Sequence, residues 1–145
     1  MTVHLSSDEE NLRMDDIRNM LSKVFWSPNI TKNEILKGIR NSALVVGAYA
    51  HDGQQVGFLR VVSDKVRFAY ILDVVVKEDF RRQGIGQAMV KFTLSHPELK
   101  DVYQWLLITK DAHGVYEKCG FEPLKNAEKW MSIRNPRPDR PVFAG

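Results

Sequence analysis

A short basic segment with two glycines has the residue types and spacing of an anion-binding site. It reads Arg81-Arg82-Gln83-Gly84-Ile85-Gly86, and it separates an apolar stretch, residues 71–76, from an amphipathic helical stripe that starts at Ile85. The first turn of a helix leaves backbone N–H groups without partners and carries the positive end of the helix dipole. Glycines let a phosphate approach the backbone closely, and arginines add directional donors. The order of strand, basic glycine turn and helix therefore predicts a phosphate site.

Two common phosphate loops fit this segment poorly. A Walker loop ends in Gly-Lys-Ser/Thr, which is missing here, and a dinucleotide fingerprint has Gly or Ala where Met89 stands. The segment resembles instead the acetyl-CoA loop of the GNAT N-acetyltransferase family, Arg/Gln-x-x-Gly-x-Gly/Ala, which is matched by Arg81, Gly84 and Gly86. An ordinary glycine turn that caps a helix is the alternative interpretation.

A second motif supports the resemblance. The apolar stretch Trp105–Thr109 is followed by Tyr116-Glu117-Lys118-Cys119-Gly120-Phe121, which is similar to the Tyr-Glu-Lys-x-Gly-Phe motif that follows a strand in the same family. The motifs and the elements between them span residues 43–133, and the N-terminal helices agree in kind only. The family often has asparagine after this strand, whereas this chain has Thr109, Lys110 and Asp111.

The resemblance implies a fold and a cofactor. The fold is α/β of the α+β kind, a mixed and mostly antiparallel sheet flanked by helices, with a parallel strand pair splayed around the acyl-CoA site. Acetyl-CoA is the implied co-substrate, and the implied reaction is direct transfer of an acetyl group, in a ternary complex, to a primary amine of a small molecule or peptide. The implied cofactor-binding residues are Val74, Val75, Val76, Arg81, Arg82, Gln83, Gly84, Ile85, Gly86 and Gln87.

Acetyl transfer needs a neutral amine, and an alkylammonium with a pKa of ~10.4 must first lose a proton. Asp73 is the only carboxylate inside the apolar stretch, where an unpaired charge is costly. It could orient the substrate ammonium, act through a water, or bond to neighbouring backbone. Some relatives carry their base at the positions of Tyr70 and Leu72, and leucine cannot serve, so deprotonation through water is a further alternative.

The remaining steps need donors for an oxyanion and an acid for the departing thiolate. By resemblance, the donors are backbone N–H groups among residues 74–76, and the acid is Tyr116, whose phenol of pKa ~10 is protonated at rest. Tyr116 could also be a packed aromatic residue. His113 is better interpreted as an exposed residue at the start of a helix than as a catalytic group. Cys119 is likewise better interpreted as a small buried thiol than as a nucleophile.

The acceptor side is expected to involve Phe25, Trp26 and Tyr70. By resemblance, two helices joined by the aromatic loop that contains Phe25 and Trp26 form a lid over the substrate. The two aromatic residues could equally form a hydrophobic plug between the helices.

Hydrophobic periodicity predicts the elements that position these residues. Residues 71–76 are expected to form a buried central strand. Helices are expected at 15–24, 31–41, 84–95 and 110–118, and strands at 2–6, 43–50, 55–62, 66–76 and 102–109. A closing hairpin is expected at 121–124 and 130–133. Residues 1–134 are expected to form a single domain, followed by a loose tail at 135–145.

Composition restricts the remaining possibilities. The 21 basic and 18 acidic residues are interleaved, which argues against nucleic acid as a partner, and the longest apolar run, residues 43–50, is far shorter than the ~20 residues that span a bilayer. The single cysteine excludes an internal disulfide and suits the cytoplasm, and no metal-ligand cluster is seen. A homodimer stays open because dimers are common among relatives. The alternatives to an enzyme are an acyl-CoA-binding or sensory module of the same fold and a nucleotide- or nucleic-acid-binding domain.

Overall fold

A mixed five-stranded sheet forms the centre of the computed structural model, which describes residues 3–145. The strands follow one another in chain order across the sheet. Neighbouring strands are antiparallel except β4 and β5, which are parallel. The strands are β1 (His4–Ser6), β2 (Leu44–Tyr49), β3 (Gln55–Ser63), β4 (Ala69–Val76) and β5 (Trp105–Leu106).

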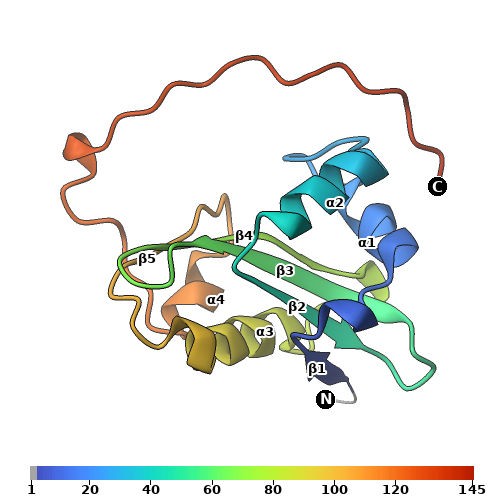
Figure 1. Ribbon diagram of the computed structural model, residues 1–145, viewed down its shortest axis with the longest axis horizontal. Helices are drawn as coiled ribbons and strands as arrows, with labels where there is room; N and C mark the ends of the chain where they lie inside the picture. Colours follow the sequence, from blue (N-terminus) through green and yellow to red (C-terminus); the bar gives the residue numbers. More distant parts are fainter. Residues whose placement is uncertain (1–2) are drawn as a thin grey trace.

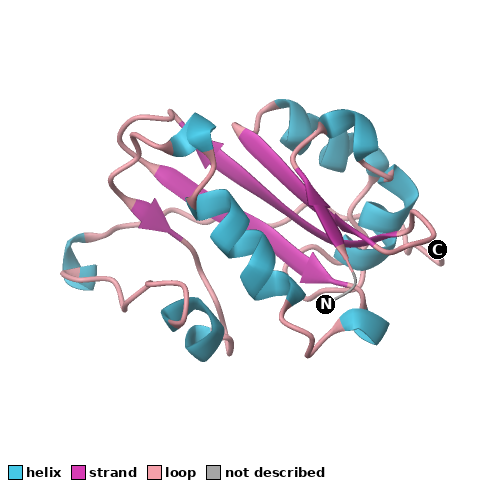
Figure 2. Cartoon of the chain, turned by 90° about the horizontal axis from the view of Figure 1, so that it is seen from below, coloured by secondary structure: helices cyan, strands magenta, loops and turns pink. Residues whose placement is uncertain are grey.

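Helices cover both faces of this sheet. Helices α1 (Met14–Leu21) and α2 (Lys32–Arg40) lie on one face, and α3 (Ile85–Leu94) and α4 (His113–Glu117) lie on the other (Figure 1). The view from below shows α3 running along the sheet with α4 beside it (Figure 2). Short 3-10 turns occupy Glu9–Asn11, Glu78–Phe80, Pro97–Leu99 and Ala127–Lys129. Among the described residues, no helix is both long and apolar enough to cross a bilayer.

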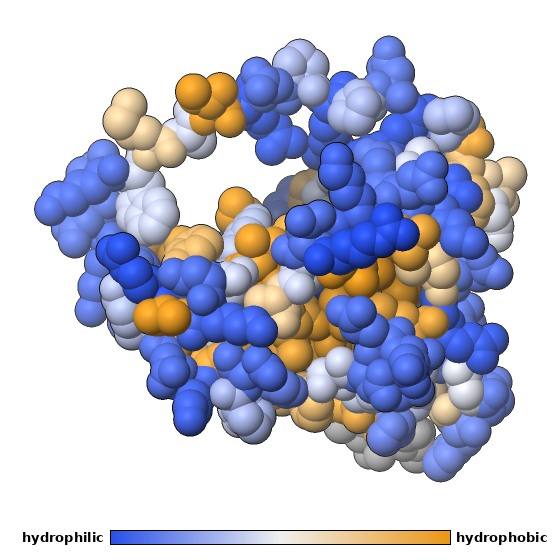
Figure 3. All heavy atoms as spheres, in the orientation of Figure 1, coloured by the Kyte–Doolittle hydropathy of each residue, from blue (hydrophilic) through white to orange (hydrophobic). Residues whose placement is uncertain are grey.

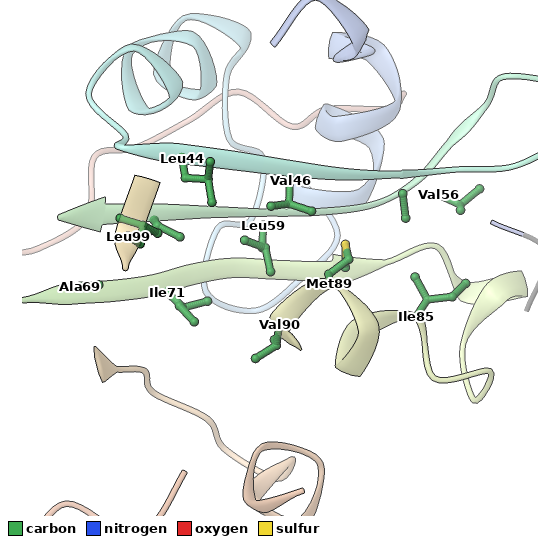
Figure 4. Close-up of a cluster of buried hydrophobic side chains, with 12 residues drawn as sticks. Leu44, Val46, Val56, Leu59, Ala69, Ile71, Ile85, Met89, Val90 and Leu99 are labelled. Carbon is green, nitrogen blue, oxygen red and sulfur yellow. The ribbon is translucent and has the colours of Figure 1, made fainter. Parts of the chain in front are cut away.

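Side chains on the two faces of the sheet contribute to two separate hydrophobic cores. Val46, Leu59 and Ile71 point toward α3 and meet Ile85 and Met89 there (Figure 4). The residues that pack against α1 and α2 point to the other face; from the sheet these are Val45, Phe58 and Val75, and Val75 reaches this face because β4 has an irregular register before it. Full burial of one such side chain stabilises the fold by about 1.5–3 kcal/mol, so both helix layers are firmly attached.

Several predicted elements are confirmed with shifted ends. Helix α2 begins at the predicted capping box, in which Thr31 and Glu34 exchange side-chain and backbone hydrogen bonds. Helix α1 ends at Leu21 rather than at residue 24, because the Ser27 hydroxyl donates to the Leu21 carbonyl and turns the chain. The edge strand β1 is present; Thr2, which was included in the prediction, lies outside the described residues.

The prediction of a buried central strand at residues 71–76 was wrong in two respects. The central strand is β3, and in β4 only Ala69, Ile71 and Val75 are buried. The strand also begins at Ala69 rather than at residue 66. The reason is that the Asp64 carboxylate accepts hydrogen bonds from the N–H groups of residues 66–68 and holds them in a turn.

A β-bulge interrupts β4 at Asp73. Phe58 faces Val75 and Arg60 faces Leu72, so Leu59 faces the two residues between them. Asp73 adopts φ +57, a left-handed conformation that an aspartate tolerates better than most residues. A bulge re-aims a side chain and increases the local twist. Here it lies where β4 separates from β5.

The predicted strand at residues 102–109 is reduced to two residues. β5 pairs with β4 only through Ala69 with Trp105 and Tyr70 with Leu106. Beyond Leu106 the two strands diverge, and the Thr109 hydroxyl accepts a hydrogen bond from the Ala112 N–H at 3.0 Å. This bond turns the chain into α4, so residues 107–109 leave the sheet.

The predicted closing hairpin at 121–124 and 130–133 was also wrong. Residues 122–134, here called the C-terminal arch, contain only the Ala127–Lys129 turn, and all of them are exposed. Pro123 offers no N–H, and the two paired residues of β5 give a hairpin little edge to join. The arch passes over the sheet with an opening beneath it (Figures 1 and 3).

The C-terminal tail, residues 135–145, is not loose as predicted. It returns to α1 and α2, where Arg140 forms a bidentate ion pair with Glu34 and the Phe143 N–H donates to the Asn29 side chain at 3.1 Å. Nothing in hydrophobic periodicity could reveal these contacts, because they are made by charged and polar groups more than a hundred residues apart.

Candidate active site

The glycine turn lies between β4 and α3, as predicted. Gly84 precedes the helix with φ +79, and no side chain bonds to the free N–H groups of the first helical turn. A Cβ at Gly84 would meet nothing within 4 Å, and one at Gly86 would only reach Val76 Cγ2 at 3.8 Å. Arg81, Arg82 and Gln83 are exposed around the turn, and the first turn of α3 has no acidic residue. These features fit a diphosphate group.

The edge of β4 that faces away from β3 is open beyond Tyr70. The Lys77 N–H donates to Val56 of β3, and backbone groups alternate in direction along a strand, so the N–H groups of Val74 and Val76 point the other way. The carbonyl of Val76 confirms this direction, because Arg81 Nε donates to it at 3.0 Å from outside the sheet. The expectation of donors among residues 74–76 thus narrows to Val74 and Val76, since the Val75 N–H points toward β3.

Tyr116 lies on the α3 side of the sheet. It packs against the core that contains Ile85 and Met89, and its ring meets Phe121 edge to face at 6.2 Å. One turn further along, Cys119 Sγ lies 4.0 Å from the Gln87 carbonyl in the first turn of α3. Burial raises the pKa of the Tyr116 phenol above 10, and the neighbouring Cys119 raises it further, so this hydroxyl keeps its proton. Tyr116 and the glycine turn therefore share one face of the sheet.

A hollow of about 850 Å³ lies next to Tyr116, but it is not the glycine site. It is lined by Leu94 and by residues 103–109, 113, 116, 117 and 119–125, without any residue of β4 or of the glycine turn. It lies along the outer side of β5, where the predicted hairpin would have continued the sheet. The glycine turn suits an anionic group better than this hollow does, because the turn offers free N–H groups and positive charge.

Asp73 is held by two side chains on the opposite face. Arg60 Nε donates to Asp73 Oδ2 at 2.7 Å, and Trp26 Nε1 donates to Oδ1 at 3.2 Å. The side chains of Arg60 and Asp73 are 20% and 12% exposed, so this ion pair is largely shielded from water. The remaining contacts of Arg60 are long ones to the Gly38 carbonyl and the Ser42 hydroxyl. The carboxylate is therefore already charge-paired rather than a free base.

The loop between α1 and α2, residues 22–31, is here called the lid loop. Its Phe25 and Trp26 rings meet edge to face at 5.2 Å, and Lys110, just after the β5 segment, places its ammonium 5.3 Å from the Phe25 ring. The two aromatic residues are 61% and 38% exposed, so they do not form a buried plug. The lid loop thus contacts β4 through Trp26 and the chain beyond β5 through Phe25.

Tyr70 lies close to the same charges. Burial raises the pKa of its phenol, the nearby Asp73 carboxylate raises it further, and Arg60 opposes this shift. The structure thus brings together the predicted residues Trp26, Tyr70 and Asp73 on one face and the glycine turn and Tyr116 on the other.

Two site residues were missed by the sequence analysis. Arg60 is the only charged residue within β3, and Asp73 is the only charged residue within β4. Two isolated opposite charges in adjacent strands could have indicated an ion pair from the sequence alone. Lys110 had no comparable signal, because its contact with Phe25 joins segments 85 positions apart.

The other residues singled out in the sequence show no catalytic setting. His113 is exposed, and burial raises the pKa of the Cys119 thiol, which opposes a nucleophilic role. Within residues 3–145, no group of three or more metal-ligating side chains is found.

Comparisons with known proteins agree with this geometry. The family model described as an acetyltransferase (GNAT) domain matches residues 41–123. An uncharacterized N-acetyltransferase of Pyropia yezoensis is 24% identical over 123 residues, which are 82% of this chain and 70% of that protein.

Solved structures show the same fold. A crystal structure from Xanthomonas campestris pv. campestris, assigned to the GNAT family of acetyltransferases, is 35% identical with a TM-score of 0.85, and the match covers 92% of this chain and 94% of that one. A GNAT family N-acetyltransferase of Escherichia coli in complex with CoA is 18% identical with a TM-score of 0.66, over 84% of this chain and 69% of that one.

Proposed function

The chain belongs to the GNAT family of acetyltransferases and is an acyltransferase, and from this premise we propose that it transfers an acetyl group from acetyl-CoA to a primary amine. The observation that carries the proposal is the position of three features on one side of the splayed strands. These are the glycine turn, the open N–H groups of β4 and Tyr116, which is partly buried against the α3 core. The CoA complex of the Escherichia coli relative supports the choice of cofactor.

Acetyl-CoA would supply an activated acetyl thioester, and the chain's own groups would hold it. The free N–H groups at the start of α3, together with Arg81 and Arg82, would bind the diphosphate. The N–H groups of Val74 and Val76 would donate to the acetyl oxygen as it gains negative charge. Tyr116 would give its hydroxyl proton to the sulfur as the carbon–sulfur bond breaks.

Asp73 would act on the acceptor. Because Arg60 and Trp26 already occupy its carboxylate, we assign to it the binding and orientation of the substrate ammonium rather than direct proton removal. The proton of the ammonium then passes to water. The acceptor is a small molecule or a peptide with an exposed primary amine, reached beneath the lid loop.

Binding and turnover test this proposal separately. Acetyl-CoA or CoA should raise the Tm in a thermal-shift assay, whereas ATP and duplex DNA should not. Thiol release from acetyl-CoA should then depend on an added amine in a panel of polyamines, amino acids, aminoglycosides and peptides. A protein that no acyl-CoA stabilises would refute the cofactor assignment.

One observation favours a second candidate, an acyl-CoA-binding module without turnover. The carboxylate nearest the reaction centre is committed to an ion pair, as it would be in a purely structural role. Such a module would be stabilised by acetyl-CoA in the thermal-shift assay and would release no thiol with any amine. The chain has a single cysteine and so no internal disulfide, which is compatible with the proposed reducing, cytoplasmic setting.

A further inference from the structure

We propose that the C-terminal tail is a functional part of the acceptor site, in which Arg140 and Arg137 are positioning residues that hold the lid loop where Trp26 reaches Asp73. The inference rests on the proposed function, because it assigns the lid loop to the acceptor. It adds a segment that neither motif includes and that lies outside the matched domain, residues 41–123.

The tail binds the outer side of the lid loop at three places. Arg137 Nη1 donates to the Phe25 carbonyl at 2.9 Å, and Arg140 Nη1 donates to the Pro28 carbonyl at 3.0 Å. The Phe143 N–H donates to Asn29 Oδ1 at 3.1 Å. Because a carbonyl bonded by a guanidinium is fixed in direction, these contacts restrain the backbone on both sides of Trp26.

Arg140 also fixes the end of the lid loop. Its Nε and Nη2 donate to the Glu34 carboxylate at 2.9 Å each, while Glu34 Oε1 accepts from the Thr31 N–H at 3.0 Å. One carboxylate thus joins the tail to the cap of α2. The Arg140 side chain is only 13% exposed, so this ion pair is better shielded than an ordinary surface pair.

Helix α1 also links the lid loop to the tail, through Arg18. The Arg18 guanidinium lies 3.9 Å from the centre of the Phe143 ring, and Arg18 Nε donates to the Ile30 carbonyl at 3.2 Å. A cation above an aromatic ring is attracted by the negative face of the ring. The tail therefore contacts both helices that flank the loop, as well as the loop itself.

The inner side of the lid loop faces the reaction centre. Trp26 bonds to Asp73, and the Phe25 ring meets Lys110 beside the opening between the strands. Val24 and Ile30 pack against the core and the Ser27 hydroxyl donates to the Leu21 carbonyl, whereas Phe25 and Trp26 are well exposed. Release of the tail should therefore free Trp26 from Asp73 without disturbing α3, and Arg60 alone would then hold the carboxylate that orients the acceptor.

The test uses Trp26 fluorescence and steady-state kinetics in the full chain. Trp105 and Trp130 are replaced by phenylalanine so that Trp26 is the only indole, and acrylamide quenching is then compared between this background and its Arg140→Ala variant. We expect stronger quenching in the variant. For the acceptor amine, we expect KM to rise about tenfold, the effect of one lost charge-assisted contact, with KM for acetyl-CoA unchanged.

Matched variants separate positioning from general destabilisation. Arg134→Ala removes a guanidinium from the exposed arch and should change neither readout. Arg140→Lys keeps the charge but not the paired geometry and should recover only part of the wild-type KM. Removal of residues 135–145 should reproduce Arg140→Ala.

The two readouts also separate this inference from the proposed function. Unchanged quenching of Trp26 in both Arg140→Ala and the truncated chain would overturn the role of the tail, whatever the activity. An equal rise in both KM values would also overturn it, because a merely structural effect is not selective for the acceptor. Stronger quenching in a protein without turnover would support the restraint of the lid and refute the enzymatic proposal instead.

Discussion

The two faces of the sheet carry the two halves of the proposed site, and these halves are built differently. On the α3 face, the glycine turn and the open edge of β4 are backbone features within residues 74–86. On the α1 and α2 face, the acceptor side is a network of side chains from the lid loop, β3, β4 and the tail. A site made of local backbone depends little on the rest of the chain. A network of side chains is weakened by the loss of any member.

The largest effect is expected on the α3 face, from Tyr116→Phe. This change keeps the ring that packs against Phe121 and removes only the proton donor, so kcat should fall about a hundredfold while both KM values stay within twofold. Because burial raises the pKa of Tyr116, the wild-type enzyme should keep its acid above the usual range of a phenol. Steady-state rates between pH 7 and pH 10 measure both effects.

Val115→Ala is the control for Tyr116→Phe. Val115 is the preceding residue of α4 and is exposed, so its truncation tests disturbance of the helix without loss of the hydroxyl. Equal turnover of the Tyr116→Phe variant and the wild type would remove the assigned acid and leave Tyr116 as a packing residue.

The second prediction breaks the network on the opposite face. Asp73→Asn removes the negative charge from the ion pair and leaves the Arg60 guanidinium without its partner. We expect kcat/KM for the acceptor to fall about thirtyfold, while the dissociation constant of acetyl-CoA, measured by calorimetry, stays unchanged. Asp101→Asn, at an exposed position, is the matched control.

If Asp73→Asn weakened acetyl-CoA binding as much as it lowers kcat/KM for the acceptor, the two faces would not be independent. The bulge provides a reason to check this point, because Asp73 adopts a left-handed conformation between the acceptor network and the N–H groups of β4. Asparagine adopts φ +57 about as readily as aspartate, so backbone strain should not contribute.

The third prediction compares the two glycines of the turn. Gly84→Ala forces a side chain into φ +79 and should lower stability by about 1 kcal/mol, although a Cβ there meets no neighbour. Gly86→Ala lies inside α3, where alanine is favoured, so the Tm should not fall. Its Cβ would nevertheless occupy the approach of a diphosphate, and acetyl-CoA affinity should weaken about fivefold.

Thermal unfolding with and without acetyl-CoA measures both glycine variants. If Gly86→Ala binds acetyl-CoA as tightly as the wild type, the diphosphate does not contact the first turn of α3. The cofactor would then have to be placed elsewhere, and the hollow beside β5 would be the next position to test.

The same contrast explains what the sequence could predict. The turn at Gly84 and Gly86, the capping box at Thr31 and the helix that follows Gly84 depend on neighbouring residues, so their patterns are local and readable. The length of β5 and the course of the arch depend on which strand edges remain free for pairing. The start of β4 depends on the turn that Asp64 holds. Hydrophobic periodicity contains no term for such competition between side chain and backbone.

The acceptor network was the least predictable part of the site. Asp73 could be selected as an isolated carboxylate, but its partners Arg60 and Trp26 come from elements 13 and 47 positions away. The contacts of Arg140 span 106 positions or more, and three prolines in the tail suggested a loose segment. Composition identifies residues that avoid a core, but it does not identify what they bind.

The smallest expected effect concerns the pH dependence of the contact between the tail and α2. The hydrogen bonds from Arg140 hold the pKa of Glu34 below the ordinary value of a glutamate in the folded protein. A carboxyl with a lowered folded pKa stabilises the fold fully above its unfolded pKa, and this contribution is lost as the pH falls through the folded value. The difference in Tm between the wild type and Arg140→Ala should therefore be constant from pH 8 to about pH 5 and shrink below that.

Salt provides an independent check on the same ion pair. Glu34 is about one third exposed, so added salt should reduce this Tm difference only in part. The Tyr116→Phe variant has no charge to titrate at acidic pH, and its Tm difference from the wild type should be independent of pH between 3 and 8. A difference for Arg140→Ala that persists unchanged at pH 3 would show that Arg140 stabilises the fold through its contact with the Pro28 carbonyl rather than through Glu34.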